Sequence, residues 1–361
     1  MTVHVNVKLA PVKPEGALMS SNRHGKKAPT MRDVAEKVGV SAQTVSAVIN
    51  DKPGITSETR ARVLAAIAEL GYRPYSVARS LRTRRTRTIA LVVSDIANPS
   101  FATMASAAED YAHRFGYSLS VYNTHDDIER ETSYVLTATQ RWIDGVLFVS
   151  AEDRMTSLDA LETAGIPAVA IDRIPQQYTG PSVTLDNVKA GRMAAEYLLK
   201  LGHTRMAHIS GPLKLRLARE RMAGYQAVLA EQGLAEAACI TREGNWVCES
   251  GYAAMVDILR SGVQPTAVFA ANDRMAIGAM HAVSQTGLRI PDDISFVGVD
   301  DIEVAAYQIP ALTTIRQSFA ELATLAVQLL LQIIEQGMPE HSQIVIEPEL
   351  IIRGSTAPFT Q

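Results

Sequence analysis

Two hydrophobic patterns with different periods divide this chain of 361 residues. Between residues 30 and 70, apolar side chains recur every three or four positions in three short segments, which is the spacing of one face of a helix. From residue 88 onward, short and mostly apolar runs alternate with longer segments of helical period. The first pattern predicts a small helical domain, and the second predicts parallel strands covered by helices.

The first two helical segments meet at a turn that contains Gly39. Gly39 stands where the first helix has to end, and glycine tolerates the positive φ that such an end requires. Ser41 can cap the second helix by accepting from an exposed backbone N–H. The apolar faces are formed by Val34, Ala35 and Val38 in the first helix and by Val45, Val48 and Ile49 in the second. Two helices joined in this way are typical of a helix-turn-helix that enters the DNA major groove, although an ordinary helical hairpin has the same periodicity.

A third helix and an arginine-rich segment favour the DNA-binding alternative. The helix is expected from about Ser57 to Leu70, with Thr56 as its cap and Gly71 at its end. Residues 75–88 follow, rich in arginine and without a carboxylate. Such a segment repels itself in isolation and is stabilised on a phosphate surface.

The helical domain and the segment after it resemble the LacI/GalR family of bacterial transcription regulators. The matching motifs are Asp33-Val34-Ala35, Gly39-Val40-Ser41, Thr44-Val45-Ser46, Asn50, Thr59-Arg60, Leu70-Gly71-Tyr72-Arg73-Pro74 and Ala78-Arg79-Ser80-Leu81. The resemblance continues at intervals to Arg353-Gly354-Ser355-Thr356 and leaves out only the first 29 residues. It implies a helix-turn-helix domain over residues 30–75, a hinge helix or linker over 76–87, and an effector-binding and dimerisation domain over 88–361. Residues 1–29 lack periodicity and are expected to form a disordered tail.

The rhythm of strands and helices restarts after Ser182–Leu185, which predicts two α/β lobes with doubly wound parallel sheets. The resemblance implies that these lobes are those of periplasmic sugar-binding proteins, with three crossings of the chain between them. We expect the crossings near Asp186, Arg316 and Ile346. Lobe 1 then holds about residues 88–186 and 317–345, and lobe 2 about residues 187–316 and 346–361.

Charge is distributed unevenly along the chain, although the net charge is only −3. The first 87 residues hold 16 Lys and Arg against 6 Asp and Glu, whereas the remaining 274 residues hold 19 against 32. A basic front on an acidic body fits a DNA-binding domain attached to a sensor domain.

Other signals exclude several classes of protein. Cys239 and Cys248 form no CxxC pair and indicate neither a disulfide framework nor a cysteine zinc site. The N-terminus lacks the apolar stretch of a signal peptide, and Gln328 and Gln332 interrupt the long apolar helix near the C-terminus, so no membrane span is expected. We expect a cytoplasmic bacterial protein that is nucleoid-associated when bound to DNA. The sequence has no GxGxxG, P-loop, GxSxG or HExxH motif, so neither an enzymatic activity nor a cofactor or metal is expected.

The first residues of the second helix are expected to face base edges in the major groove. The predicted DNA-contacting residues here are Ser41, Ala42, Gln43, Thr44, Ala47 and Asn50. Gln43 can form a bidentate pair with adenine, worth about 1–3 kcal/mol of discrimination, whereas Ala42 can offer only an apolar contact. Ser41, Thr44 and Asn50 are better suited to holding phosphate or capping helices. Ala47 stands where the family commonly has an arginine, which leaves the half-site sequence open.

Ala78, Arg79 and Leu81 match the hinge helix of the family. In that resemblance the hinge helices of two subunits pair in the minor groove, and the leucine wedges into the central base step. An apolar wedge unstacks such a step and kinks the duplex. Packing of Leu81 against the sensor domain is the alternative. A homodimer on pseudo-palindromic double-stranded operator DNA is expected, because one helix-turn-helix reads too few bases.

Polar residues follow three predicted strands of the sensor domain. They are Asp172, the pair Asn272 and Asp273, and the pair Asp300 and Asp301. Because ligands bind beyond the carboxyl ends of parallel strands, these side chains are expected to converge on one cleft. Carboxylates and an amide suit hydroxyl-rich ligands, but the same residues can cap helices. We assign Asp172, Asn272 and Asp300 to the effector and expect Asp273 and Asp301 to be helix caps.

Three more effector-binding residues are implied by the resemblance. Arg221 matches the ligand-binding arginine of the family, Trp246 falls where the purine-repressor branch has a ligand-stacking aromatic residue, and Phe101 matches another aromatic residue of the cleft. An aromatic face suits a sugar ring, although Phe101 can equally be a core residue. Leu215 and Leu217 stand where the purine branch has polar contacts, which argues against a purine corepressor.

These features together predict a repressor whose affinity for its operator is controlled by a small carbohydrate-like effector bound between the lobes. Two alternatives remain at this stage. One is the same fold regulated by a protein partner or without a small-molecule effector. The other is a cytoplasmic binding protein without a DNA function, against which the helix-turn-helix motifs and the arginine-rich segment count.

Overall fold

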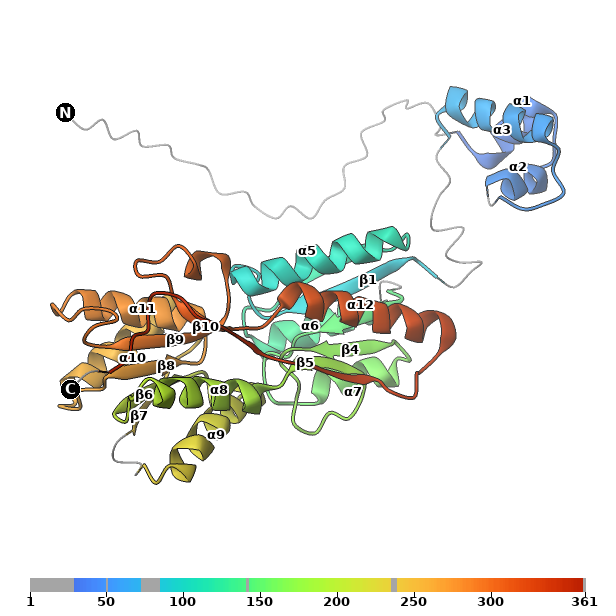
Figure 1. The fold of residues 1–361 in the computed structure, drawn as a ribbon. Helices are drawn as coiled ribbons and strands as arrows, with labels where there is room; N and C mark the ends of the chain where they lie inside the picture. Colours follow the sequence, from blue (N-terminus) through green and yellow to red (C-terminus); the bar gives the residue numbers. More distant parts are fainter. Residues whose placement is uncertain (1–28, 50, 73–84, 141–142, 235–238, 360–361) are drawn as a thin grey trace, which may run out of the picture. The chain divides into compact units, whose positions relative to one another are not determined.

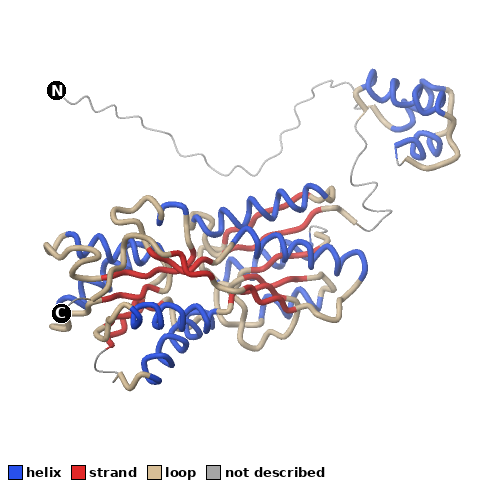
Figure 2. Tube along the Cα trace, in the orientation of Figure 1, coloured by secondary structure: helices blue, strands red, loops and turns tan. Residues whose placement is uncertain are grey.

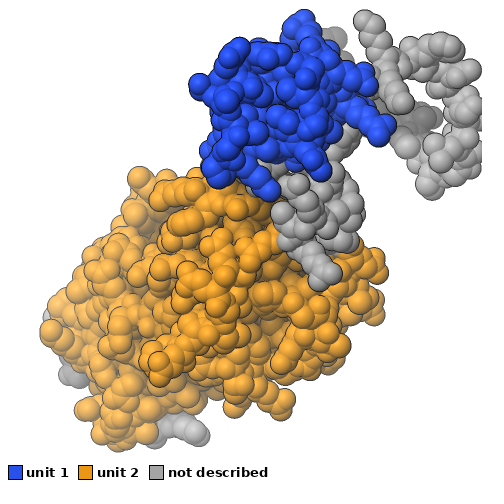
Figure 3. Space-filling model, turned by 90° about the vertical axis from the view of Figure 1, so that its right-hand side faces the viewer, with its two compact units in different colours: residues 1–78 blue, residues 79–361 orange. Residues whose placement is uncertain are grey.

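The computed structural model describes residues 29–49, 51–72, 85–140, 143–234 and 239–359. The chain divides into two compact units, residues 1–78 and residues 79–361, which Figure 3 colours separately.

The first unit is a three-helix domain. Its helices are α1 (Met31–Val38), α2 (Ala42–Ile49) and α3 (Ser57–Leu70). Gly39 ends α1 with φ 72°, and the Ser41 hydroxyl accepts from the Thr44 N–H at 3.1 Å at the start of α2, so both sequence expectations are confirmed. Thr56 caps α3 as expected. The core is formed by Val34, Ala35, Val38, Val45, Val48, Val63, Ala66 and Tyr72.

Lobe 1 of the second unit is a parallel sheet covered on both faces (Figures 1 and 2). The strand order is β11-β5-β4-β3-β1-β2, formed by β1 (Thr88–Val93), β2 (Ser118–Asn123), β3 (Gly145–Phe148), β4 (Ala168–Ile171), β5 (Ser182–Leu185) and β11 (Gln343–Ile346). Alternate residues of β1 enter two cores, because successive side chains of a strand point to opposite faces. One core contains α5 (Pro99–Arg114) and α12 (Phe319–Gln336), and the other contains α6 (Ile128–Gln140) and α7 (Thr156–Thr163).

Lobe 2 repeats this architecture with one antiparallel edge strand. Its strand order is β12-β10-β9-β8-β6-β7, formed by β6 (Met206–Ser210), β7 (Cys239–Glu243), β8 (Ala267–Ala270), β9 (Ser295–Asp300), β10 (Thr313–Arg316) and β12 (Glu349–Ile351). The helices are α8 (Asn187–Lys200) and α9 (Arg216–Glu231) over one core and α10 (Cys248–Arg260) and α11 (Asp273–Ser284) over the other, with a short 3-10 helix, η2 (Glu303–Ala305), before β10. The two doubly wound parallel-sheet lobes predicted from the sequence are thus confirmed.

The chain passes between the lobes three times. It leaves lobe 1 after β5 for α8, returns from β10 to α12, and crosses again between β11 and β12. Four strands, β7, β10, β11 and β12, were not predicted as strands. β7, β11 and β12 lie at sheet edges and β10 carries polar residues, so none has the continuous apolar run of a central strand.

Helix α12 is, among the described residues, the one helix long and apolar enough to cross a membrane by length and composition. It packs on α5 and on the sheet of lobe 1, with Phe319, Leu322, Ala326 and Leu330 buried in that core. Its apolar character is therefore explained by the core that it covers.

The close crossing of α8 and α9 depends on two glycines. A Cβ on Gly191 would lie 2.0 Å from the Arg221 carbonyl oxygen, and a Cβ on Gly224 would lie 2.0 Å from the Val188 carbonyl oxygen. Neither contact can be relieved by a side-chain rotation, because both oxygens belong to the backbone.

We predict that Gly191→Ala lowers the free energy of unfolding by about 3 kcal/mol, because the added methyl must push the two helices apart. Urea unfolding of the full chain measures this value. Ala230→Val, which enlarges an exposed position of α9, is the control and is expected to cost less than about 1 kcal/mol. Equal losses in the two variants would contradict the close crossing.

Candidate effector cleft and DNA-reading helix

The six residues predicted to bind an effector line one cavity between the two lobes. Asp172, Asn272 and Asp300 reach it from the carboxyl ends of β4, β8 and β9. The complete lining consists of Asn98, Phe101, Asp172, Arg173, Leu217, Arg221, Trp246, Asn272, Asp300 and Phe319. The parallel-strand rule therefore locates the polar residues of the cavity correctly, while their binding of an effector remains a prediction.

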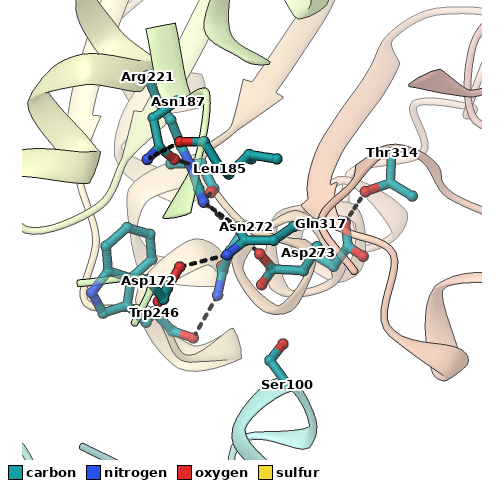
Figure 4. A network of polar contacts seen from close by, with 12 residues as sticks. Ser100, Asp172, Leu185, Asn187, Arg221, Trp246, Asn272, Asp273, Thr314 and Gln317 are labelled. Atoms are coloured by element: carbon teal, nitrogen blue, oxygen red, sulfur yellow. Dashed lines mark hydrogen bonds and ion pairs between the residues drawn. The ribbon is translucent and has the colours of Figure 1, made fainter. Parts of the chain in front are cut away.

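A network of polar contacts centred on Arg221 crosses from one lobe to the other (Figure 4). The guanidinium donates from Nε to Asn187 Oδ1 at 2.9 Å and from Nη2 to Gln317 Oε1 at 2.8 Å. Its Nη1 donates to the Ala271 carbonyl at 2.5 Å and lies 3.9 Å from Asp300 Oδ1. Gln317 in turn donates to Asp172 Oδ1 at 2.5 Å, so the network joins strand ends of both lobes through a crossing segment.

Arg173 is a cleft residue that the sequence analysis missed. Its guanidinium lies 5.3 Å from the ring centroid of Phe101 and 5.8 Å from that of Trp246, and it pairs with Asp126. The side chain is only 5% exposed. A cation between two aromatic rings is stabilised by both π faces. Its position next to Asp172 could have identified Arg173 from the sequence, since a residue that follows a strand end can reach the same cleft.

The central cavity has a volume of about 20 Å³, which is room for about one water molecule. Larger spaces open on either side of it. One, of about 250 Å³, shares Asp300 and Phe319 with the cavity, and the other, of about 310 Å³, shares Asp172 and Leu217. The lobes are therefore closed on each other at the centre, where Arg173 fills the space between the aromatic rings.

Ion pairs also join the lobes around the cleft. Arg274 of lobe 2 lies 3.5 Å from Asp95 of lobe 1. Arg219 lies 2.5 Å from Asp153, and Lys214 lies 3.2 Å from Glu152. These pairs hold the closed arrangement by contacts within the chain itself, and their partly exposed positions make each of them individually weak.

Burial raises the pKa of Asp300 to about 7. Arg221 acts in the opposite direction, and the neighbouring carboxylate of Asp172 raises the pKa further. The Asp300 backbone has φ 117°, and Asp172, Trp246 and Asp301 also have positive φ values. Such backbone strain in non-glycine residues is typical of functional sites. A carboxyl that titrates near neutrality can accept or donate a hydrogen bond to a ligand hydroxyl.

The prediction that Asp273 and Asp301 are helix caps was wrong. Asn272 caps α11 by accepting from the Met275 N–H at 2.9 Å, and it also lines the cavity. Asp273 instead accepts from the Ile302 N–H at 3.0 Å and from the Thr314 hydroxyl at 2.5 Å, and burial raises its pKa well above the usual range.

Asp301 is held by two arginines rather than by a helix. It accepts from Arg316 at 2.8 Å and from Arg353 at 2.5 Å, on strand β10 and beyond β12. Its carboxylate thus fixes the loop after β9 to the edge of the sheet. The hydrogen-bond partners of Asp273 and Asp301 thus lie far along the chain and not in the adjacent helix.

Leu215 and Leu217 are buried in the core of lobe 2, and Leu217 also lines the central cavity. An apolar wall at this point offers no hydrogen bond to a ligand. Among the described residues, no group of three or more His, Cys, Asp or Glu side chains is arranged to hold a metal ion.

The start of α2 presents its predicted DNA-contacting residues unevenly. Ser41 and Gln43 are exposed, whereas Ala42, Thr44 and Ala47 are half-buried. Ser41 is engaged as the cap, and its hydroxyl lies 2.9 Å from that of Thr44, which leaves Gln43 as the exposed side chain able to reach a base edge. Asn50, Ala78, Arg79 and Leu81, with most of the expected tail and hinge, lie outside the described residues.

The buried carboxyl of Asp300 makes stability depend on pH. Its pKa of about 7 in the folded protein lies above the ordinary aspartate value of 3.8, so ionisation opposes folding as the pH rises from about 4 to 7. We predict that Asp300→Asn gains stability relative to the wild type across this interval, because the amide cannot ionise. Urea unfolding between pH 4.5 and 7.5 measures the difference. Glu303→Gln, an exposed carboxylate nearby, is the control, and a constant difference for Asp300→Asn would refute the assignment.

Comparisons with known proteins agree with this architecture. Residues 30–75 match the bacterial regulatory proteins of the lacI family, and residues 195–356 match a periplasmic binding protein-like domain. The HTH-type transcriptional repressor PurR of Pasteurella multocida (strain Pm70) is 38% identical over 327 residues, which cover 90% of this chain and 98% of that protein.

Two solved structures extend the comparison to the fold. The lac repressor dimer bound to operator and the anti-inducer ONPF is 34% identical with a TM-score of 0.85, covering 92% of this chain and 100% of the other. The complex of the transcriptional regulator CelR with cellobiose is 31% identical with a TM-score of 0.70, covering 91% and 99%. With its helix-turn-helix domain and its two parallel-sheet lobes, the chain belongs to the LacI/GalR family of DNA-binding transcriptional repressors.

Proposed function

We propose that this repressor is controlled by a small carbohydrate-like effector bound in the cleft between its lobes. The observation that carries the proposal is the composition of the central cavity. Asp172, Asn272 and Asp300 supply oxygen acceptors for hydroxyl groups, and Arg221 supplies donors. Phe101 and Trp246 supply aromatic faces of the kind that pack against a sugar ring.

The chain's relatives point to more than one effector class. One relative is the transcriptional repressor PurR, and a structural neighbour is a regulator in complex with cellobiose. Leu217 gives the cavity an apolar wall at one position where the resemblance implies a polar contact in the purine branch. The carboxylates at the strand ends favour a polyhydroxylated ligand, because each can accept from two hydroxyl groups.

The proposed mechanism is a shift between two arrangements of the lobes. An effector that separates or reorients them displaces Arg173 from the aromatic rings and breaks the Gln317–Asp172 contact. This changes the spacing of the hinge segments in a homodimer and therefore the affinity for a pseudo-palindromic operator. The coupling is reciprocal, so an effector that weakens DNA binding is itself bound more weakly by the DNA complex.

In this proposal the parts of the chain have separate tasks. Residues 30–75 read DNA, residues 76–87 form the hinge, and residues 88–361 bind the effector and dimerise, while residues 1–29 form a tail. The protein acts in the bacterial cytoplasm and associates with the nucleoid when bound to its operator.

A second candidate is a repressor that closes without a small molecule and responds to a protein partner or to none. It is favoured by the central volume of about 20 Å³ and by the ion pairs that already join the lobes. The two candidates differ in whether any small molecule stabilises the protein.

Thermal unfolding of the full chain against sugars, polyols, sugar acids and nucleobases tests the effector class. A ligand at one hundred times its dissociation constant is expected to stabilise the wild type by about 2.7 kcal/mol. We expect a sugar-like ligand to stabilise the wild type by this amount. The same ligand should not stabilise Trp246→Ala. Asp292→Asn, an exposed carboxylate change remote from the cleft, is the control and should keep it. A panel without any response would favour the second candidate, and a response to nucleobases alone would favour a purine.

Base reading by α2 is tested through Gln43. We predict that Gln43→Ala loses about 1–3 kcal/mol of discrimination at one adenine of each half-site, because the bidentate pair is removed. Selection from random duplexes with wild type and variant, followed by titration of the selected sites, measures this. An unchanged preference at every position would exclude Gln43 from base reading, whereas a uniform loss would assign it to phosphate.

A further inference from the structure

The carboxylate of Asp144 accepts three hydrogen bonds from the segment that leads into β1. Asp144 Oδ1 accepts from the Thr86 N–H at 2.8 Å and from the Thr86 hydroxyl at 2.9 Å, while Oδ2 accepts from the Arg87 N–H at 2.9 Å. The backbone N–H of Asp144 donates to the Thr88 carbonyl at 2.9 Å. Three donors on one partly buried carboxylate make a strong, charge-assisted attachment.

Arginine side chains of the same segment reinforce the attachment. Arg87 donates to the Phe115 carbonyl at 3.0 Å, and its guanidinium lies 5.5 Å from the ring centroid of Tyr117. Arg85 donates to the Ile334 carbonyl at 2.9 Å, in the last turn of α12. A cation at a helix C-terminus is also favoured by the helix dipole. Residues 85–87, which we name the exit segment, are thus held on lobe 1 at several points.

Helix α12 connects this attachment to the cleft. Its first residue, Phe319, lines the central cavity, and Gln317 just before it contacts both Arg221 and Asp172. Its 18 residues span about 27 Å at 1.5 Å per residue, and its last turn meets Arg85.

Helix α12 packs closely against the residue that follows Asp144. A Cβ on the adjacent Gly145 would lie 2.8 Å from Leu330 Cδ1 and 3.0 Å from Ile334 Cδ1. Helix α12 therefore rests directly on the start of β3, where the carboxylate that holds the exit segment is located. A rigid helix with one end in the cleft and the other at the attachment can move both together.

We propose that Asp144 is a positioning residue for DNA binding, which fixes the exit segment to lobe 1 so that the path of the chain toward the helix-turn-helix domain follows the movement of that lobe. The carboxylate touches no DNA in this role. It acts through the backbone of Thr86 and Arg87, and α12 couples it to the residues of the cleft. Without the carboxylate of Asp144 the exit segment loses three of its hydrogen bonds to lobe 1. A segment that is held less firmly loses more entropy when DNA orders it.

Electrostatics and positioning predict opposite effects of removing this carboxylate. Asp144→Ala deletes a negative charge beside an arginine-rich segment, so a purely electrostatic effect strengthens binding to the polyanion. If Asp144 instead positions the exit segment, its removal weakens DNA binding. The sign of the change in DNA affinity therefore separates the two.

The test uses the full chain and the duplex that the wild type selects from a random library. Asp144→Ala is expected to bind this duplex at least tenfold more weakly, and Asp144→Asn, which keeps one acceptor, to lose less. Asp159→Ala, an exposed carboxylate of lobe 1, is the charge-matched control and should bind as tightly as the wild type or more tightly. Hydrogen exchange of the peptide that contains residues 85–92 should quicken in Asp144→Ala, with the sheet of lobe 2 unchanged.

Gly145→Ala tests the role of α12 without touching the carboxylate. The added methyl displaces Leu330 and Ile334, so exchange of residues 85–92 should also quicken and DNA affinity should fall at least threefold. Should Asp144→Ala fail to fold, Asp144→Asn and Gly145→Ala carry the test. Unchanged or tighter DNA binding in the folded Asp144 variants would overturn the proposal. An equal loss of DNA affinity in Asp144→Ala and in the control Asp159→Ala would overturn it as well.

Discussion

The buried charge of Arg221 is the constraint on which the arrangement of the two lobes depends. A guanidinium that is 1% exposed is destabilising unless its donors are satisfied, and the partners lie at the points where the chain changes lobe. Asn187 begins α8 after the first crossing, and Gln317 lies in the second. Gln317 in turn donates to Asp172 of lobe 1. The hydrogen bonds that satisfy Arg221 therefore connect the crossing segments to the strand ends.

The cleft that results is polar, aromatic and already filled. Arg173 occupies the space between Phe101 and Trp246 and is neutralised by Asp126. A ligand that enters must therefore replace contacts that the protein makes with itself. The free energy of these internal contacts opposes the entry of a ligand and lowers the affinity with which it can bind.

The same closed lobes are joined mechanically to the segment that leads to the DNA-binding domain. Helix α12 begins at the cleft and ends against Arg85, and Gly145, which follows Asp144 in the chain, lies against Leu330 and Ile334 of its last turns. Lobe 1 thus contributes both a wall of the cleft and the attachment of the exit segment. Lobe 2 contributes Arg221 and the arginines that form ion pairs with carboxylates of lobe 1.

The sequence by itself determined the elements and the place of the cleft. Hydrophobic period depends on neighbours within a few residues, so the helices and the strands with continuous apolar runs were correctly predicted, and Gly39 and Ser41 marked the turn before α2. The rule for parallel strands brought Asp172, Asn272 and Asp300 to one cavity because it depends only on chain direction.

Only the tertiary structure decided which polar residues are partners. Arg173 pairs with Asp126, 47 positions away, and Asp301 with Arg353, 52 positions away. Edge strands such as β7 and β11 were missed because their pairing, and not their own pattern, makes them strands. Contacts of this kind depend on how the lobes pack and on which ends of distant segments meet. A local pattern contains no such information, since the fold decides which distant side chains meet to form an ion pair.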